Sequence, residues 1–233
     1  MVNLTAEMAQ LWESLGAPKP GQGRVVQFVA ATRGEGTSTI SREFARFAAG
    51  RCKRPVWLVD LDLLANGQYA ALAADTARFG ELGPPAAATP NGHVFFTIQP
   101  PGQDSRGWQI PDAQYLCGHQ AGSTGLWVTR FRKETLKPGQ RPALAVGGAY
   151  WSGLRRHADM VVVDAPAAER ASAAIAIAPM VDCTVLVVAA EGDDTRGPAA
   201  LRDAIEQAGG QCAGLVFNRA RLQPPKFLKA ILP

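Results

Sequence analysis

The feature that most constrains the fold is an apolar strand joined to an amphipathic helix by a glycine-containing turn. The run VVQFVAA at 25–31 is β-branched and apolar, which is typical of a strand covered on both faces. The turn TRGEG follows, and the next segment, STISREFARFAAG, has helical periodicity and ends at Gly50. Its apolar residues recur at helical spacing: Ile40, Phe44, Phe47 and Ala48.

Further apolar runs extend this unit into a sheet. Buried strands are predicted for VWLV at 56–59, MVVV at 160–163, CTVLVVAA at 183–190 and AGLVF at 213–217. A helix over about 197–208 separates the last two strands. Strands that alternate with helices indicate a mainly parallel sheet with right-handed crossovers, so we expect an α/β sandwich of three layers.

The chain divides into three parts. Residues 1–23 form a short amphipathic helix (4–16) and a linker rich in glycine and proline. Residues 24–220 form the α/β domain, and residues 221–233 form a tail of alternating basic and apolar residues. Within the domain, 81–125 is rich in Pro, Gly, Thr and Gln, with one clear strand, VFFTIQ at 94–99. We interpret this segment as a loop-rich insertion.

Composition excludes several classes of protein. Hydrophobic residues make up 47% and charged residues 19% of the 233 residues, which is incompatible with a wholly disordered chain. The formal net charge of +4 is spread along the chain and does not indicate nucleic-acid binding. No apolar run reaches the roughly 18–20 residues of a membrane span, and the N-terminus lacks the features of a signal peptide. We therefore expect a cytoplasmic protein.

Polar residues collect where the predicted strands end. They are the turn at 31–39, Asp60 and Asp62, Asp164, and the pair Asn218-Arg219. Ligands of open parallel sheets bind at this edge, and a glycine turn before a helix presents backbone N–H groups to an anion. Each feature also has an ordinary structural explanation, as a tight turn or a solvated strand end. Their joint position favours a nucleotide site, with Ser38 placed to hold magnesium.

The three motifs RGEGTST, VDLD and VVVDAP resemble those of the deviant-Walker P-loop family. They are most similar to the cytoplasmic domains of bacterial tyrosine kinases (BY-kinases) of exopolysaccharide and holdfast secretion. The resemblance covers about 24–80 and 126–220, and it implies ATP or ADP with magnesium as ligands. The catalytic residues that it implies are Asp60, Asp62 and Asp164. The nucleotide-binding residues that it implies are Gly34, Glu35, Gly36, Thr37, Ser38, Thr39, Asn218 and Arg219. The implied magnesium ligands are Ser38, Asp60 and Asp164.

The sequence departs from the BY-kinase pattern in three places. Thr37 stands where the family has the P-loop lysine, and the loss of one charge-assisted hydrogen bond costs about 1.5–3 kcal/mol. Arg33 on the same loop is the candidate replacement. The tail has no tyrosine, whereas BY-kinases phosphorylate a C-terminal tyrosine cluster. The N-terminal helix has Gln10 and Glu13 where the family's oligomerisation motif has arginines.

These observations predict a kinase-like component of exopolysaccharide biosynthesis or export that binds nucleotide weakly or not at all. The expected partner is a membrane polysaccharide co-polymerase or another export component, which would place the protein at the inner face of the cell membrane. The tail is a candidate attachment element. Two alternatives stay open: an active Mg-ATP-dependent tyrosine kinase or ATPase, and a positioning ATPase of the partitioning type. Whether the protein forms a homo-oligomer also stays open.

Overall fold

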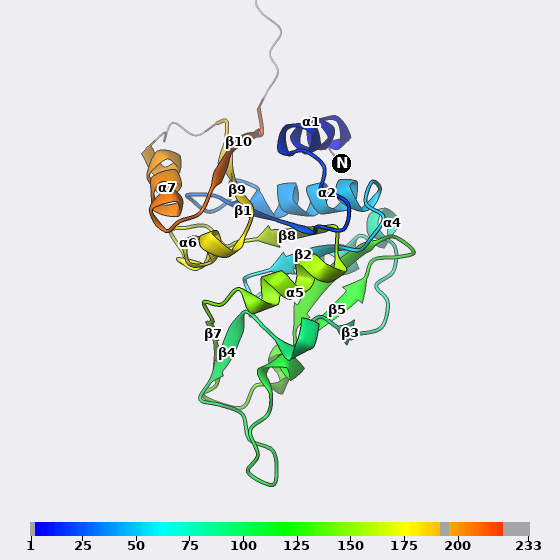
Figure 1. Cartoon of the computed structure of the whole chain (residues 1–233), viewed down its shortest axis with the longest axis vertical. Helices are drawn as coiled ribbons and strands as arrows, with labels where there is room; N and C mark the ends of the chain where they lie inside the picture. The colour runs from blue at the N-terminus through cyan, green and yellow to red at the C-terminus, as the bar shows by residue number, and fades with distance from the viewer. Residues whose placement is uncertain (1–2, 192–195, 221–233) are drawn as a thin grey trace, which may run out of the picture.

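The structure is a computed structural model that describes residues 3–191 and 196–220. Among these residues, eight strands form the main sheet (Figure 1). In spatial order they are β10 (Cys212–Asn218), β9 (Cys183–Ala189), β1 (Arg24–Val29), β8 (Met160–Asp164), β2 (Val56–Asp60), β6 (Leu126–Phe131), β5 (Leu116–Gln120) and β3 (Ala86–Ala87). The first six are parallel, and β5 and β3 are antiparallel additions at one edge. The predicted α/β sandwich with a mainly parallel sheet is confirmed.

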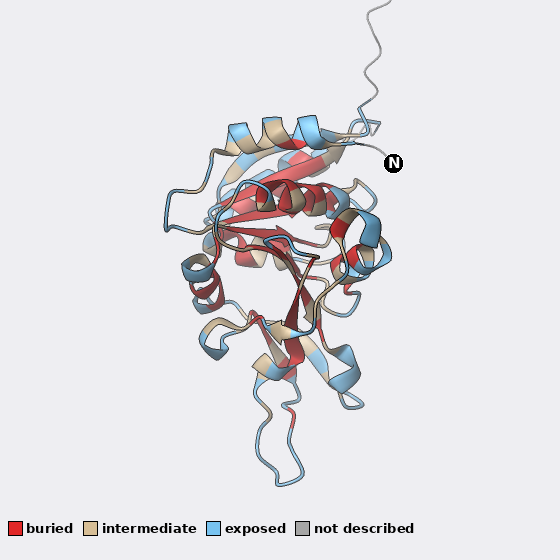
Figure 2. Cartoon of the chain, turned by 90° about the vertical axis from the view of Figure 1, so that its right-hand side faces the viewer, coloured by how far each residue is buried: buried red, intermediate tan, exposed pale blue. Residues whose placement is uncertain are grey.

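Helices cover both faces of the sheet, which explains why its central strands are apolar on both sides. One face carries α5 (Ala149–His157), α6 (Ala173–Ile177) and α7 (Arg196–Gln207). The other carries α2 (Thr37–Ala49), α3 (Gly67–Ala74) and α4 (Thr76–Phe79). Figure 2 shows the buried residues concentrated along the central strands and the exposed residues on loops and outer helix faces. Short 3₁₀ turns lie at Pro90–Gly92, Asp112–Tyr115, Lys133–Thr135 and Ala178–Met180.

The predicted N-terminal helix is α1 (Thr5–Leu15), and it packs on α2 rather than on the sheet. Met8 is buried in the core beneath it. The Trp12 ring lies 6.2 Å from the Phe44 ring and 6.3 Å from the Phe47 ring, centroid to centroid. The helix therefore forms a further layer outside the three of the sandwich (Figure 1).

The insertion at 81–125 is more structured than its composition indicates. The strand expected at 94–99 is β4 (Phe96–Gln99), which pairs with β7 (Arg141–Leu144) in a separate two-stranded sheet. We did not predict β5, which joins the main sheet by antiparallel pairing with β6. Figure 1 shows the β4–β7 pair at the end of the molecule away from α1.

Two sequence-based expectations concern the tail and membrane-spanning segments. The tail at 221–233 lies outside the described residues, so its role as an attachment element stays a prediction. In the described part of the chain, no helix is both long enough and apolar enough to cross a membrane.

Candidate functional site

The turn between β1 and α2 has a backbone that requires glycine. Gly34 has φ of 83°, and Gly36, which caps the N-terminus of α2, has φ of 94° and ψ of 16°. Both values lie in the left-handed region, where side chains are strained. A Cβ added to Gly36 would also lie 2.0 Å from Nδ2 of Asn218. The sequence RGEG therefore fits this turn for steric reasons.

The turn presents free hydrogen-bond donors. Within the described part of the chain, the backbone N–H groups of residues 34–38 have no intramolecular acceptor. The N–H of Arg33, by contrast, donates to Oε1 of Glu169 at 2.7 Å. Consecutive N–H groups at the N-terminus of a helix form a cradle for an anion such as phosphate.

Two carboxylates lie beside this cradle at the ends of neighbouring strands. Asp60 ends β2 and Asp164 ends β8, and the two are paired in the sheet register. Each residue is 5% exposed. Burial and the adjacent charge of Asp164 raise the pKa of Asp60 to about 7, although backbone N–H groups of Gln68 and Asp62 act against this rise. Burial also raises the pKa of Asp164, against the hydrogen bond from Gln68.

Gln68 connects these groups, and sequence reasoning missed it. Its side chain is fully buried, and its Nε2 lies 2.6 Å from Oδ2 of Asp164 and 2.9 Å from the carbonyl of Ser38. Its backbone N–H donates to Oδ2 of Asp60 at 3.0 Å, and its Oε1 accepts from Arg42 at 3.1 Å. Gln68 therefore fixes both carboxylates relative to the start of α2.

The arrangement fits a magnesium ion with few protein ligands. Oδ1 of Asp164 is buried and has no hydrogen-bond partner among the described residues, and both Asp164 and Ser38 line the cavity at this site. Both oxygens of Asp60 already accept backbone hydrogen bonds. The described residues contain no cluster of three or more His, Cys, Asp or Glu side chains suited to a metal. Magnesium usually keeps several waters and takes one or two protein ligands plus phosphate oxygens. Here Asp164 and Ser38 would be the protein ligands.

The cavity has a volume of about 380 Å³ and lies between three loops. The turn between β1 and α2 (residues 32–39, the P-loop) supplies residues 32–34 and 36–39. The segment at the end of β2 supplies Asp60 and Asp62, and the segment at the end of β8 supplies residues 164–167 and Arg170. Thr37 is nearly buried and brings no charge. The Arg33 side chain is exposed and makes no hydrogen bond or ion pair with any residue that the structure describes.

Asn218 and Arg219 reach the P-loop from the end of β10. Nδ2 of Asn218 donates to the carbonyl of Glu35 at 2.8 Å, and its Oδ1 accepts from the N–H of Arg219 at 2.9 Å. The Arg219 guanidinium donates to the carbonyl of Gly34 at 2.7 Å. Both side chains thus hold the turn in shape. Contact of Asn218 with an adenine ring stays a prediction.

The structure brings the predicted site residues to one edge of the sheet and adds residues that no motif identified. Asp60, Asp62, Asp164, Arg219 and most of the P-loop line the cavity. Glu35 is not among the residues that line the cavity, and its carboxylate accepts a hydrogen bond from the Thr32 hydroxyl at 2.5 Å. The added residues are Gln68, Glu169 and Arg170. Their only signal in the sequence is their position after strands that end in Asp.

Comparisons with solved structures show which proteins share this fold. The kinase domain of VpsO is 20% identical, with a TM-score of 0.53 over 93% of this chain and 95% of that one. The kinase domain of the Escherichia coli tyrosine kinase ETK is 16% identical, with a TM-score of 0.55 over 95% and 77%. The cell division protein MinD of Aquifex aeolicus is also 16% identical, with a TM-score of 0.50 over 89% and 73%. Neither models of known protein families nor curated protein sequences match the chain. The chain therefore has the fold of deviant-Walker P-loop proteins, BY-kinase domains among them.

Proposed function

We propose that this protein is a cytoplasmic, kinase-like component of exopolysaccharide biosynthesis or export whose nucleotide site is weakened. One observation carries the proposal: the phosphate cradle of the P-loop is intact, but its lysine position holds the uncharged Thr37. A cradle of N–H groups still binds phosphate, and the missing charge-assisted hydrogen bond lowers affinity by about 1.5–3 kcal/mol. The loss is larger for phosphoryl transfer, where more negative charge must be stabilised.

The placement of the tyrosines supports the absence of tyrosine autophosphorylation. The chain has three tyrosines. Tyr115 and Tyr150 are buried, and Tyr69 is half-buried beside the His119 ring. None is an exposed acceptor. In this proposal the protein acts through a partner interface, and the partner is a membrane polysaccharide co-polymerase or another export component that holds it at the inner face of the membrane.

An active Mg-ATP-dependent kinase or ATPase is the second candidate. It is favoured by the convergence of Ser38, Asp60 and Asp164 on one cavity, which a purely structural turn does not need. A positioning ATPase of the partitioning type shares the fold, as the likeness to MinD indicates. The missing lysine counts against both alternatives.

Restoring the lysine tests the proposal. In the free protein, Thr37→Lys places an ammonium near the positive end of α2 and lowers stability by about 0.3–1 kcal/mol. With Mg-ATP, the new charge-assisted contact contributes about 1.5–3 kcal/mol, so the melting temperature rises clearly. Adding Asp164→Asn removes most of the magnesium dependence. If the wild type already binds Mg-ATP with micromolar affinity or gains phosphotyrosine, the site is not weakened. If folded Thr37→Lys shows no stabilisation at millimolar Mg-ATP, the cavity is not a nucleotide site.

Removing the tail tests the partner. Truncation from Gln223 onward leaves every described element intact, because the last strand ends at Asn218. We expect an unchanged circular dichroism spectrum and reduced co-purification with the co-polymerase. Unchanged co-purification would assign the attachment surface to the described domain instead.

A further inference from the structure

Arg170 occupies a distinctive position at the cavity. It belongs to the loop after β8, six residues beyond Asp164, and it lines the same cavity as Thr37 and the P-loop glycines. Its Nη2 lies 2.8 Å from Oδ2 of Asp62, which belongs to the loop after β2. The ion pair therefore joins two walls of the cavity. The Arg170 and Asp62 side chains are 46% and 24% exposed, so both are within reach of a ligand.

The other two arginines that line the cavity are less suited to bind a ligand's phosphate. The Arg219 guanidinium is already bound to the carbonyl of Gly34 and holds the turn. The Arg33 side chain is exposed and makes no hydrogen bond or ion pair with any described residue, so no contact in the described chain fixes its guanidinium at the cavity. The Arg170 guanidinium, by contrast, is held at the cavity by an ion pair with Asp62, which also lines the cavity.

We propose that Arg170 supplies the positive charge that Thr37 lacks, by leaving Asp62 and binding the terminal phosphate of a nucleoside di- or triphosphate. This inference rests on the proposed nucleotide site. A part-exposed ion pair contributes little to stability, so its exchange for a phosphate costs little. A guanidinium binds phosphate oxygens through two parallel hydrogen bonds, and the loop that carries Arg170 is hydrogen-bonded to the start of the glycine turn through Glu169. Asp62 then acts as a competitor of the phosphate for Arg170.

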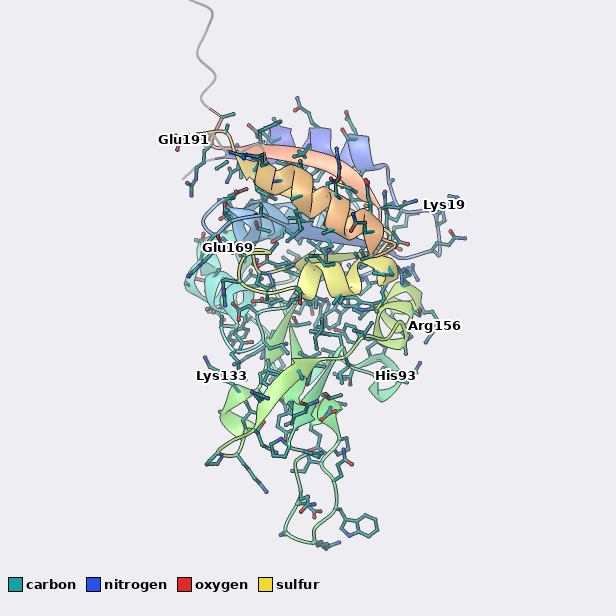
Figure 3. All side chains as sticks on the ribbon, turned by 90° about the vertical axis from the view of Figure 1, so that its left-hand side faces the viewer. Lys19, His93, Lys133, Arg156, Glu169 and Glu191 are labelled. Atoms are coloured by element: carbon teal, nitrogen blue, oxygen red, sulfur yellow. The ribbon has the colours of Figure 1, made fainter. Side chains whose placement is uncertain are left out.

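The first test measures Mg-ADP and Mg-ATP binding by calorimetry and thermal shift, up to millimolar ligand. Arg170→Gln is expected to weaken the affinity by about 10- to 100-fold relative to wild type. The matched control is Arg156→Gln, an exposed arginine of α5 that does not line the cavity and is expected to change nothing. Figure 3 shows Arg156 on the opposite side of the molecule from Glu169, the neighbour of Arg170 in the chain. Equal affinities of Arg170→Gln and wild type, including no detectable binding by either, overturn the inference.

The second test uses Asp62→Asn, for which this inference predicts a gain. If Asp62 competes for Arg170, its neutralisation tightens nucleotide binding several-fold, and the gain disappears in Asp62→Asn/Arg170→Gln. A gain of equal size in both backgrounds means that the carboxylate merely repels phosphate, and it overturns the role of Arg170. A loss of affinity in Asp62→Asn overturns it as well.

Thr37→Lys separates this inference from the proposed function. In that background the lysine supplies the charge, so Arg170→Gln is expected to cost only a few-fold. If Thr37→Lys binds Mg-ADP but wild type and Arg170→Gln do not, the nucleotide site stands and the role of Arg170 is wrong. If Thr37→Lys also fails to bind, the nucleotide site itself is wrong, and the role of Arg170 falls with it.

Discussion

The cavity edge of the sheet buries two carboxylates, whereas the aromatic cluster around α5 buries large rings. At the cavity, Asp60 and Asp164 are buried side by side with raised pKa values, and the N–H groups of residues 34–38 have no acceptor in the described chain. Around α5, the rings of Phe95, Tyr150 and Trp151 pack with centroids 5.0–5.5 Å apart. Such rings contribute stability through burial and mutual packing.

The difference indicates where the molecule gives up stability for binding. Buried carboxylates without a cation cost free energy. A binding site needs these groups uncompensated until the ligand arrives, and this cost is offset elsewhere in the fold. We therefore expect substitutions in the aromatic cluster to destabilise the protein, and some substitutions at the cavity to stabilise it.

The largest expected effect is the loss of Trp151. Trp151 is fully buried against Phe95 and Tyr150. Trp151→Ala is expected to lower the free energy of unfolding by about 3–5 kcal/mol, measured by urea denaturation. Trp108→Ala is the matched control, because that ring is 73% exposed and its removal is expected to change stability little. A similar small change in both variants would show that the cluster does not carry the stability assigned to it.

The next effect tests the buried charge at the cavity through its pH dependence. The folded-state pKa of Asp60 is about 7, above its ordinary value, so the folded state binds the proton more tightly than the unfolded state. Wild-type stability therefore falls as the pH rises toward 7, by about 1.4 kcal/mol per pH unit between the two pKa values. Asp60→Asn does not titrate. The free energy of unfolding of Asp60→Asn minus that of wild type is therefore expected to increase by about 2–3 kcal/mol as the pH is raised from 5 to 8.

Asp159 provides the control of opposite sign. Burial alone would raise its pKa, but hydrogen bonds from the backbone and side chain of Arg54 and from the N–H of Lys53 outweigh burial and lower it. Its ionised form is therefore stabilised above the unfolded-state pKa, and that stability is lost as the pH falls through the lower folded-state pKa. Asp159→Asn is expected to destabilise the protein equally at pH 5 and pH 8. A flat difference between wild type and Asp60→Asn across this range would contradict the raised pKa.

The parallel half of the sheet was predictable because its strands are continuous apolar runs. β1, β8 and β9 lie between helices on both faces, so burial selects mainly apolar residues, and the pattern is visible without any partner. Gln27 of β1 and Thr184 of β9 are buried polar exceptions, and they are hydrogen-bonded to each other. β5 has the sequence LCGHQ, in which polar His119 and Gln120 hide the strand. His119 is buried, and its Nδ1 lies 2.8 Å from the carbonyl of Gly83, 36 residues away, which satisfies this ring nitrogen in the folded chain. That partner is visible only in the folded chain.

The same distinction applies to the candidate site. The P-loop glycines, Asp60 and Asp164 were predictable because glycine turns and strand-terminal acids have local signatures. Gln68 and Arg170 have none. Their roles depend on Asp164 and Asp62, which lie 96 and 108 positions away along the chain. The residues at the ends of the strands therefore have local signatures, whereas the residues that position them or pair with them do not.

The smallest expected effect compares two glycines of one turn. Both Gly34 and Gly36 have left-handed backbones, so an alanine at either position is strained, at a cost of about 1–2 kcal/mol. A Cβ at position 34 meets open space, whereas a Cβ at position 36 displaces the Asn218 amide that donates to the carbonyl of Glu35. Gly36→Ala is therefore expected to cost about 1 kcal/mol more than Gly34→Ala, which is the contribution of one hydrogen bond. In the Asn218→Ala background this excess is expected to vanish, and thermal denaturation of the four variants measures it. An excess that survives without Asn218 would mean that another group, and not the end of β10, fixes the P-loop.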